Sequence, residues 1–86
     1  MYSVYILKSG KDGNLYIGQT HNVELRIKMH NAGRVKATRN RRPMTLLIHK
    51  DYQTRAEAMK MEKYLKNLKG GNEFQKIMTH WGFAKW

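Results

Sequence analysis

The chain has 86 residues, with 17 lysines and arginines against 6 aspartates and glutamates, so its formal net charge is +11. Residues 1–86 fit a single small domain with a thin core, and the charge exceeds what solubility requires, which favours a polyanionic partner. The absence of cysteine excludes disulfides and thiolate chemistry, and without an apolar span or a leader-like N-terminus we expect no membrane partner and a cytoplasmic location.

The first residues have a pattern typical of a β-hairpin. Residues 2–8 are rich in β-branched and aromatic side chains, which favour a strand. Residues 9–13 are turn formers, and residues 14–19 are expected to return as a second strand. The sequence therefore predicts two antiparallel strands at the start of the domain.

The alternation of side chains along these two strands predicts their register. Pairing residue 4 with 17 and residue 6 with 15 places one apolar set on a single face. The members of that set are Val4, Ile6, Leu15 and Ile17. The same register places Tyr5 directly opposite Tyr16 on the other face.

A short helix and a basic loop are expected next. Asn22 is a favourable N-cap for a helix over residues 23–31, and Gly33 stands just past its end, where glycine is common. Residues 32–43 carry five cations and no acid, and their composition, closed by Pro43, predicts a loop.

The second half is expected to add one strand and two helices. Residues 44–52 have a nearly continuous apolar centre, which predicts a strand. Thr54 and Glu57 form a capping box for a helix over residues 55–68, and a last helix begins at Asn72. The fold class is therefore α+β, a three-stranded antiparallel sheet flanked by helices, in the order strand, strand, helix, strand, helix, helix.

Two tyrosines of the hairpin are the first candidate catalytic residues. Tyrosine is a favoured strand residue, so Tyr5 and Tyr16 can simply stabilise the hairpin. A phenol can also orient a water molecule or, as phenolate, remove its proton. Because the ordinary pKa of a phenol is about 10, the catalytic role requires neighbouring cations that lower it.

Arg26 and His30 lie four residues apart and therefore share one face of the expected helix. A guanidinium can hold a phosphate oxygen whose charge grows in the transition state. A histidine can hold the attacking water or transfer a proton, because it titrates near neutrality. Solvated surface side chains are the alternative for both. None of the four histidines has the spacing of a zinc site.

Glu62 is the candidate metal ligand. It precedes Lys66 by four residues, so a simple ion pair along the helix is the alternative. However, it lies at the edge of the helix face expected to meet the sheet, and it is one of few acids in a basic chain. One carboxylate, with water and substrate phosphate, is an ordinary arrangement for Mg²⁺, and Mn²⁺ is a substitute.

The basic loop is the candidate nucleic-acid-binding surface. Its cations would clamp a phosphate backbone and make binding depend steeply on salt, whereas plain solvated charge is the alternative. These cations are Arg34, Lys36, Arg39, Arg41 and Arg42. Trp81, Phe83 and Trp86 are further candidates for stacking on bases. Core packing is preferred for Trp81, and the roles of Phe83 and Trp86 stay open.

In order and spacing these residues resemble the GIY-YIG nuclease domain, and most closely its small UPF0213-type members. Tyr5 ends the run Ser3-Val4-Tyr5, and Tyr16 begins Tyr16-Ile17-Gly18. Arg26 follows ten residues after Tyr16, with His30 one turn later and Glu62 on the helix after the third strand. The resemblance runs from residue 2 to about residue 66. Ser3 departs from the motif, which has glycine there.

The resemblance implies a role for each of these residues. Tyr5 corresponds to the general base, Tyr16 to its partner, Arg26 to the phosphate-contacting arginine, His30 to a water-positioning residue and Glu62 to the single metal ligand. Proteins of the family hydrolyse DNA with a divalent metal in restriction, homing, repair and junction resolution, and usually a separate domain chooses the target.

The sequence thus predicts an endonuclease that hydrolyses DNA phosphodiester bonds with Mg²⁺ or Mn²⁺, with branched or repair intermediates as candidate substrates. RNA is an alternative substrate. Two other functions stay open: a basic nucleic-acid-binding module with weak or no catalysis, and a subunit of a larger DNA-processing complex whose partner supplies target choice.

Overall fold

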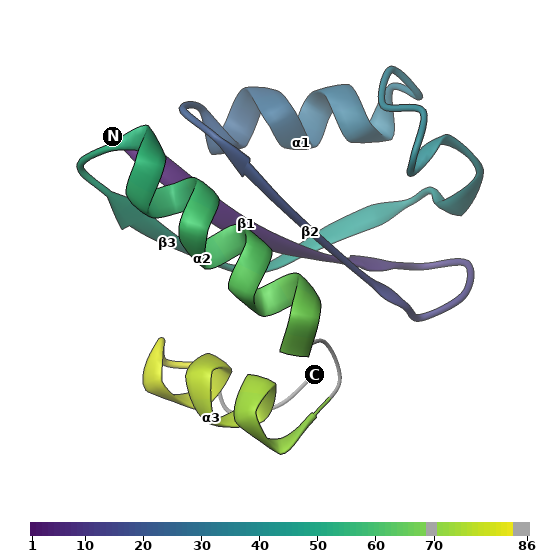
Figure 1. The fold of residues 1–86 in the computed structure, drawn as a ribbon. Helices are drawn as coiled ribbons and strands as arrows, with labels where there is room; N and C mark the ends of the chain where they lie inside the picture. The colour runs from purple at the N-terminus through teal and green to yellow at the C-terminus, as the bar shows by residue number, and fades with distance from the viewer. Residues whose placement is uncertain (69–70, 84–86) are drawn as a thin grey trace.

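The computed structural model describes residues 1–68 and 71–83 and contains one three-stranded antiparallel sheet (Figure 1). Its strands are β1 (Tyr2–Ser9), β2 (Leu15–Thr20) and β3 (Met44–Tyr52), arranged in the order β2-β1-β3. The first strand therefore occupies the centre of the sheet, and β2 and β3 are its edges. The predicted α+β fold class is confirmed.

Three helices accompany the sheet in the part of the chain that the structure describes. They are α1 (Val23–Asn31), α2 (Arg55–Leu68) and α3 (Asn72–His80), and a single 3₁₀ turn over Arg39–Arg41 interrupts the basic loop. No helix within the described ranges is long and apolar enough to cross a membrane.

The local signals that begin these helices are present as predicted. The Asn22 side chain accepts a hydrogen bond from the Leu25 N–H and caps α1. The capping box of α2 is complete, because the Thr54 N–H donates to Glu57 Oε1 and the Glu57 N–H donates to Thr54 Oγ1, both at 3.2 Å. Glu57 is thereby explained by its structural role.

The predicted hairpin register is wrong by two residues. Residue 6 pairs with residue 17, not with residue 15, and Tyr5 lies opposite Gly18 while Tyr16 lies opposite Leu7. The reason is the turn, which contains four residues: the Ser9 N–H donates to the Asn14 carbonyl at 2.9 Å. A shift by an even number of residues keeps each side chain on its predicted face.

The two faces of the sheet therefore bury two different clusters. One cluster holds the predicted apolar set of the hairpin together with side chains of α2 and α3, namely Val4, Ile6, Leu15, Ile17, Ala58, Leu65, Phe74 and Met78. The other cluster, on the α1 side, holds Tyr5, Leu7 and Met44, with Tyr16 and Ile27 packed against it. Tyr5 thus lies beneath α1 in the middle of the sheet.

Candidate functional site

Tyr5 is the centre of the candidate site. It projects from the central strand, and its side chain is only 1% exposed. Its ring lies across Gly18 of the neighbouring strand, where a Cβ atom would overlap the Tyr5 hydroxyl. The glycine of the Tyr-Ile-Gly motif therefore has a physical reason: it leaves room for the Tyr5 phenol to reach α1.

Two side chains of α1 meet the Tyr5 hydroxyl. His30 Nε2 lies 2.9 Å from the phenolic oxygen, and Arg26 Nε–H donates to the same oxygen over 3.4 Å. Because these residues are four apart on one helix face, a single docking of α1 places both. The structure thus brings together three of the predicted site residues at one oxygen atom.

Tyr16 forms the outer wall of the same cluster. Its ring centroid lies 6.4 Å from that of Tyr5 and 5.1 Å from that of His30, which it meets edge to face. Tyr16 is half-buried, whereas His30 is fully buried. The accessible surface of this cluster is therefore contributed by Tyr16 and the half-buried Arg26, and His30 contributes none.

The charges of this cluster follow from its burial. Burial raises the pKa of Tyr5, although its hydrogen bond to Arg26 acts in the opposite direction. The same hydrogen bond raises the pKa of Arg26, with Tyr16 contributing. Burial, with the nearby Arg26 charge, lowers the pKa of His30 to about 4. At neutral pH the guanidinium is charged, and the phenol and the imidazole are neutral.

Thr38 belongs to this cluster, and sequence reasoning missed it. Its hydroxyl lies 2.7 Å from His30 Nδ1, and both side chains are 0% exposed. In the sequence, Thr38 is a single threonine among the cations of the basic loop, and no motif spacing links it to His30. The contact depends on how the loop folds back over α1.

Glu62 lies on α2, the helix that packs on the opposite face of the sheet from Tyr5. Its side chain is 21% exposed, and its carboxylate accepts an ion pair from Lys66 at 3.0 Å, so the predicted helix pair is present. Its negative charge also contributes to the raised pKa of Tyr5, as the weakest of several causes.

Glu62 fits a metal site of one particular kind. Across residues 1–68 and 71–83, no group of three or more histidine, aspartate or glutamate side chains is placed to hold a metal. A cation here would thus take one protein carboxylate and complete its shell with water and substrate phosphate, as Mg²⁺ commonly does. Lys66 is paired with this carboxylate, so a bound cation would have to displace it.

Three of the five loop cations bind their own loop or hairpin. Arg39 donates to the Gly33 carbonyl at 3.0 Å, Arg42 donates to the Arg39 carbonyl at 2.8 Å, and Arg41 forms an ion pair with Asp12 at 3.2 Å. These contacts shape the loop. Arg41 is half-buried, whereas the other four loop cations, Arg34 and Lys36 among them, are exposed.

The structure describes two of the three aromatic residues considered for stacking on bases. Trp81 and Phe83 pack against the cluster beneath α2 and α3, so core packing accounts for them. Trp86 lies outside the described residues. Ser3, at the motif's glycine position, donates a hydrogen bond to Asp51 at 2.5 Å and so ties β1 to β3.

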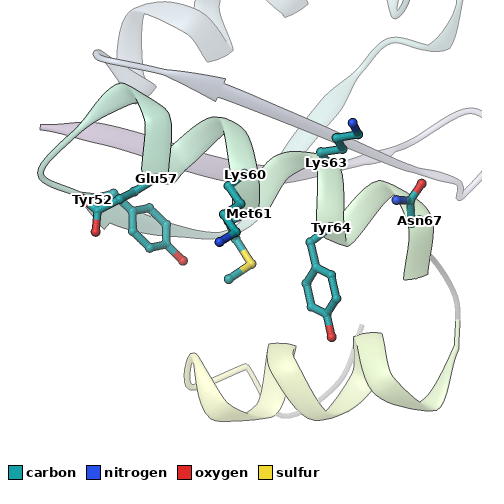
Figure 2. A pocket seen from close by; sticks show the side chains of 7 residues that line it. All are labelled: Tyr52, Glu57, Lys60, Met61, Lys63, Tyr64 and Asn67. Carbon is teal, nitrogen blue, oxygen red and sulfur yellow. The ribbon is translucent and has the colours of Figure 1, made fainter.

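A separate groove of about 620 Å³ runs along the outer side of α2. Figure 2 shows Met61 between the rings of Tyr52 and Tyr64, with Lys60 beside it. Its lining side chains do not include those around the Tyr5 hydroxyl. The candidate site is therefore a packed polar cluster with one half-buried wall, and it is not this groove.

Comparison with known proteins identifies the family of this chain. A model described as the GIY-YIG catalytic domain matches residues 1–75, and the chain therefore belongs to the GIY-YIG nuclease family. The three-stranded sheet with flanking helices is the fold expected from that resemblance.

Within the family, the similar proteins carry the name UPF0213. The chain is 44% identical over 80 residues to UPF0213 protein CPE1444 of Clostridium perfringens, covering 92% of this chain and 85% of that protein. It is 47% identical over 64 residues to UPF0213 protein SH2523 of Staphylococcus haemolyticus, covering 73% and 77%. The solution NMR structure of UPF0213 protein BH0048 from Bacillus halodurans matches with a TM-score of 0.59 at 36% identity, covering 95% and 88%.

Proposed function

We propose that this protein is a divalent-metal-dependent endonuclease that hydrolyses phosphodiester bonds in DNA. One observation carries the proposal: Tyr5, His30 and Arg26 converge on a single phenolic oxygen, with Arg26 Nε and His30 Nε2 at 3.4 and 2.9 Å. This arrangement joins a proton acceptor to a phosphate-binding cation. Hydrolysis of a phosphodiester needs both.

Arg26 binds the scissile phosphate in this mechanism. Its guanidinium is half-buried beside Tyr16 and is held charged by the two phenols. Charge on the phosphate oxygens grows as water attacks, so a preorganised guanidinium stabilises the transition state more than the ground state. The phosphate in turn offsets the Arg26 charge that contributes to the low pKa of His30.

Tyr5 moves the proton of the attacking water. The water gives a proton to the phenolic oxygen while the Tyr5 hydroxyl gives its own proton to His30 Nε2, and the oxygen of the water forms the new bond to phosphorus. The bond to the leaving oxygen breaks, and that oxygen takes up a proton from solvent. His30 then returns its proton to the Tyr5 oxygen, and Tyr5 releases a proton to solvent, which restores the starting state. Tyr16 forms the outer wall that orients these groups.

Glu62 is the residue that would hold Mg²⁺ or Mn²⁺. When bound, the cation supplies charge stabilisation for the phosphate and the leaving group. The exposed loop cations Arg34, Lys36, Arg39 and Arg42 would extend the phosphate-binding surface, whereas the half-buried Arg41 also joins the loop to the hairpin through Asp12.

The direct test is incubation of the purified protein with plasmid, flap, fork and four-way DNA in Mg²⁺ or Mn²⁺. Cleavage should vanish in Tyr5→Phe, Arg26→Ala and Glu62→Gln, while DNA binding survives in the first and the last. The matched controls Tyr64→Phe, Arg55→Ala and Glu73→Gln change the same residue types at exposed positions and should cleave normally. Normal cleavage by Glu62→Gln would refute the metal ligand.

A second candidate function is nucleic-acid binding without turnover. It is favoured by the burial of Tyr5, which is 1% exposed and has a raised pKa, so the phenol is not a base in the resting protein. This alternative predicts salt-sensitive binding and no cleavage of any DNA in the panel, with either metal. A partner protein that supplies target choice would then also have to supply activity.

A further inference from the structure

Both ring nitrogens of His30 have a partner in the protein. Nε2 lies 2.9 Å from the Tyr5 hydroxyl and Nδ1 lies 2.7 Å from the Thr38 hydroxyl. His30 and Thr38 are 0% exposed. The imidazole is therefore held between two hydroxyl groups, and which nitrogen carries its proton depends on which hydroxyl donates.

The contacts at the two ends of this chain favour the same proton arrangement. At one end, the Thr38 hydroxyl can donate to the Val35 carbonyl at 3.5 Å, which leaves its oxygen free to accept from Nδ1–H. At the other end, the Tyr5 oxygen accepts from Arg26, which leaves the Tyr5 proton for Nε2. If His30 carried its proton on Nε2 instead, that nitrogen could not accept the proton of the buried Tyr5 hydroxyl.

The loop holds Thr38 in place by backbone contacts. The Thr38 N–H donates to the Val35 carbonyl at 3.1 Å, and the Arg41 N–H donates to the Thr38 carbonyl at 2.9 Å. The Ser9 hydroxyl in turn donates to the Arg41 carbonyl at 2.6 Å, which fastens the loop to the hairpin. These contacts fix the backbone that carries the Thr38 hydroxyl.

We propose that Thr38 is a positioning residue that fixes the tautomer of His30, keeping the proton on Nδ1 and the Nε2 lone pair directed at the Tyr5 hydroxyl. This inference rests on the proposed function, because the Nε2 lone pair receives the Tyr5 proton during hydrolysis. Thr38 acts only through His30 and does not touch the DNA. The basic loop consequently has a second role beside its charge: it supplies the end of the hydrogen-bond chain.

The first experiment measures the tautomer directly and needs no activity. Long-range ¹H–¹⁵N NMR of the imidazole at neutral pH distinguishes a protonated Nδ1 from a protonated Nε2. We expect protonated Nδ1 in the wild type and in Thr38→Ser, and a shift toward protonated Nε2 in Thr38→Val, which keeps the shape but lacks the hydroxyl. A wild-type His30 protonated on Nε2, or an unchanged tautomer in Thr38→Val, would overturn the proposal.

The second experiment measures cleavage by the same variants. Thr38→Val should lower kcat by about 10-fold to 100-fold, by analogy with the partners that orient metal-ligating histidines, with KM for DNA unchanged. Thr38→Ser should restore most of the rate, and the exposed control Thr45→Val should match the wild type. Thermal unfolding of each variant identifies any loss due to misfolding, and in that case Thr38→Ser decides.

Together the two experiments distinguish failure of the proposed nuclease function from failure of the positioning role of Thr38. If no variant or wild type cleaves DNA, the proposed function fails while the NMR result still decides the tautomer. If the wild type cleaves and Thr38→Val cleaves equally well, the positioning role fails and the nuclease stands.

Discussion

At the scale of single residues, the site depends on the burial of polar groups that satisfy one another. Within the described ranges, no buried side-chain nitrogen or oxygen lacks a hydrogen-bond partner. The Tyr5 hydroxyl, the His30 ring and the Thr38 hydroxyl therefore form a chain in which each group depends on the next. Loss of one member leaves its neighbour unpaired, which costs about 1–3 kcal/mol in a buried position.

His30 makes the stability of the fold depend on pH. Its pKa is lowered from 6.5 to about 4 in the folded chain. Between these values the unfolded chain binds a proton that the folded chain does not, so the free energy of unfolding falls as pH decreases through this window. The expected loss by pH 4 is about 3 kcal/mol. Urea denaturation of the wild type and His30→Gln at several pH values measures it.

The free energy of unfolding of His30→Gln should change less with pH between 6.5 and 4 than that of the wild type, whatever the absolute stability of the variant. The exposed His21→Gln is the matched control and should keep the wild-type slope. The lowered pKa values of Asp12 and Asp51 favour folding above their ordinary value of 3.8, so their contribution is lost only at the acid end. Equal slopes in the wild type and His30→Gln would contradict the buried neutral imidazole.

The position of the Tyr5 ring explains why residue 18 is a glycine. A Cβ atom at position 18 would overlap the Tyr5 hydroxyl and lie 2.6 Å from the carbon that bears it. Gly18→Ala should therefore destabilise the fold by about 1–3 kcal/mol, as overpacking does, and displace the phenol from Arg26. Thermal or urea denaturation measures the cost.

The double variant Gly18→Ala/Tyr5→Leu tests the cause, because a shorter side chain at position 5 removes the overlap. We expect the alanine to cost less in that background than in the wild type, a coupling of neighbouring sites that a double-mutant cycle detects. Strict additivity of the two changes would mean that Gly18 is needed for another reason.

At the scale of elements, capping residues predicted correctly where α1 and α2 begin, because a cap acts on the neighbouring backbone. Asn22 and the Thr54–Glu57 capping box fix where helices begin through contacts within four residues, and the structure has both. The hairpin register depended on the turn, and the left-handed Gly13, with φ of 74°, belongs to a four-residue turn that alternation alone does not specify. The facing of Tyr5 survived this error because the shift was even.

The docking of α1 is the element-scale feature on which the site depends most. Asn31, at its last turn, donates to the Met44 carbonyl at 2.9 Å and accepts from the Met44 N–H at 2.7 Å. This pair joins α1 to the start of β3. It could not be predicted from the sequence, because it joins segments whose spacing in the chain sets no distance in space.

Asn31→Ala should consequently lower the free energy of unfolding by about 1–3 kcal/mol, since the Met44 backbone groups lose both partners. Arg26 and His30 lie on the same helix, so kcat should fall as well. Denaturation and DNA cleavage are measured together, with the exposed Asn67→Ala on α2 as control. A variant with wild-type stability would show that packing, and not this pair, holds α1.

At the scale of the whole molecule, the net charge of +11 is distributed between structural and ligand-facing roles. Composition predicted the polyanionic partner class but gave no division among the loop cations. The division follows from burial and contacts: Arg41 is half-buried, pairs with Asp12 and also donates to the Leu15 carbonyl, whereas the other four loop cations are exposed. Only the exposed cations are expected to release counterions on binding DNA.

DNA binding should therefore lose salt dependence when exposed cations are removed. For duplex DNA the logarithm of the binding constant falls with the logarithm of salt concentration by about 0.9 per phosphate neutralised. Arg34→Gln and Lys36→Gln should each reduce this slope by about 1, measured by fluorescence anisotropy across salt concentrations. Arg41→Gln should instead weaken the attachment of the loop to the hairpin and lower the thermal unfolding temperature, with a smaller effect on the slope.

Lys50→Gln, an exposed cation on β3 outside the loop, is the control for net charge alone. If Lys50→Gln reduced the slope as much as Arg34→Gln, the loop would hold no privileged contact, because the DNA would then respond to the overall charge of the protein.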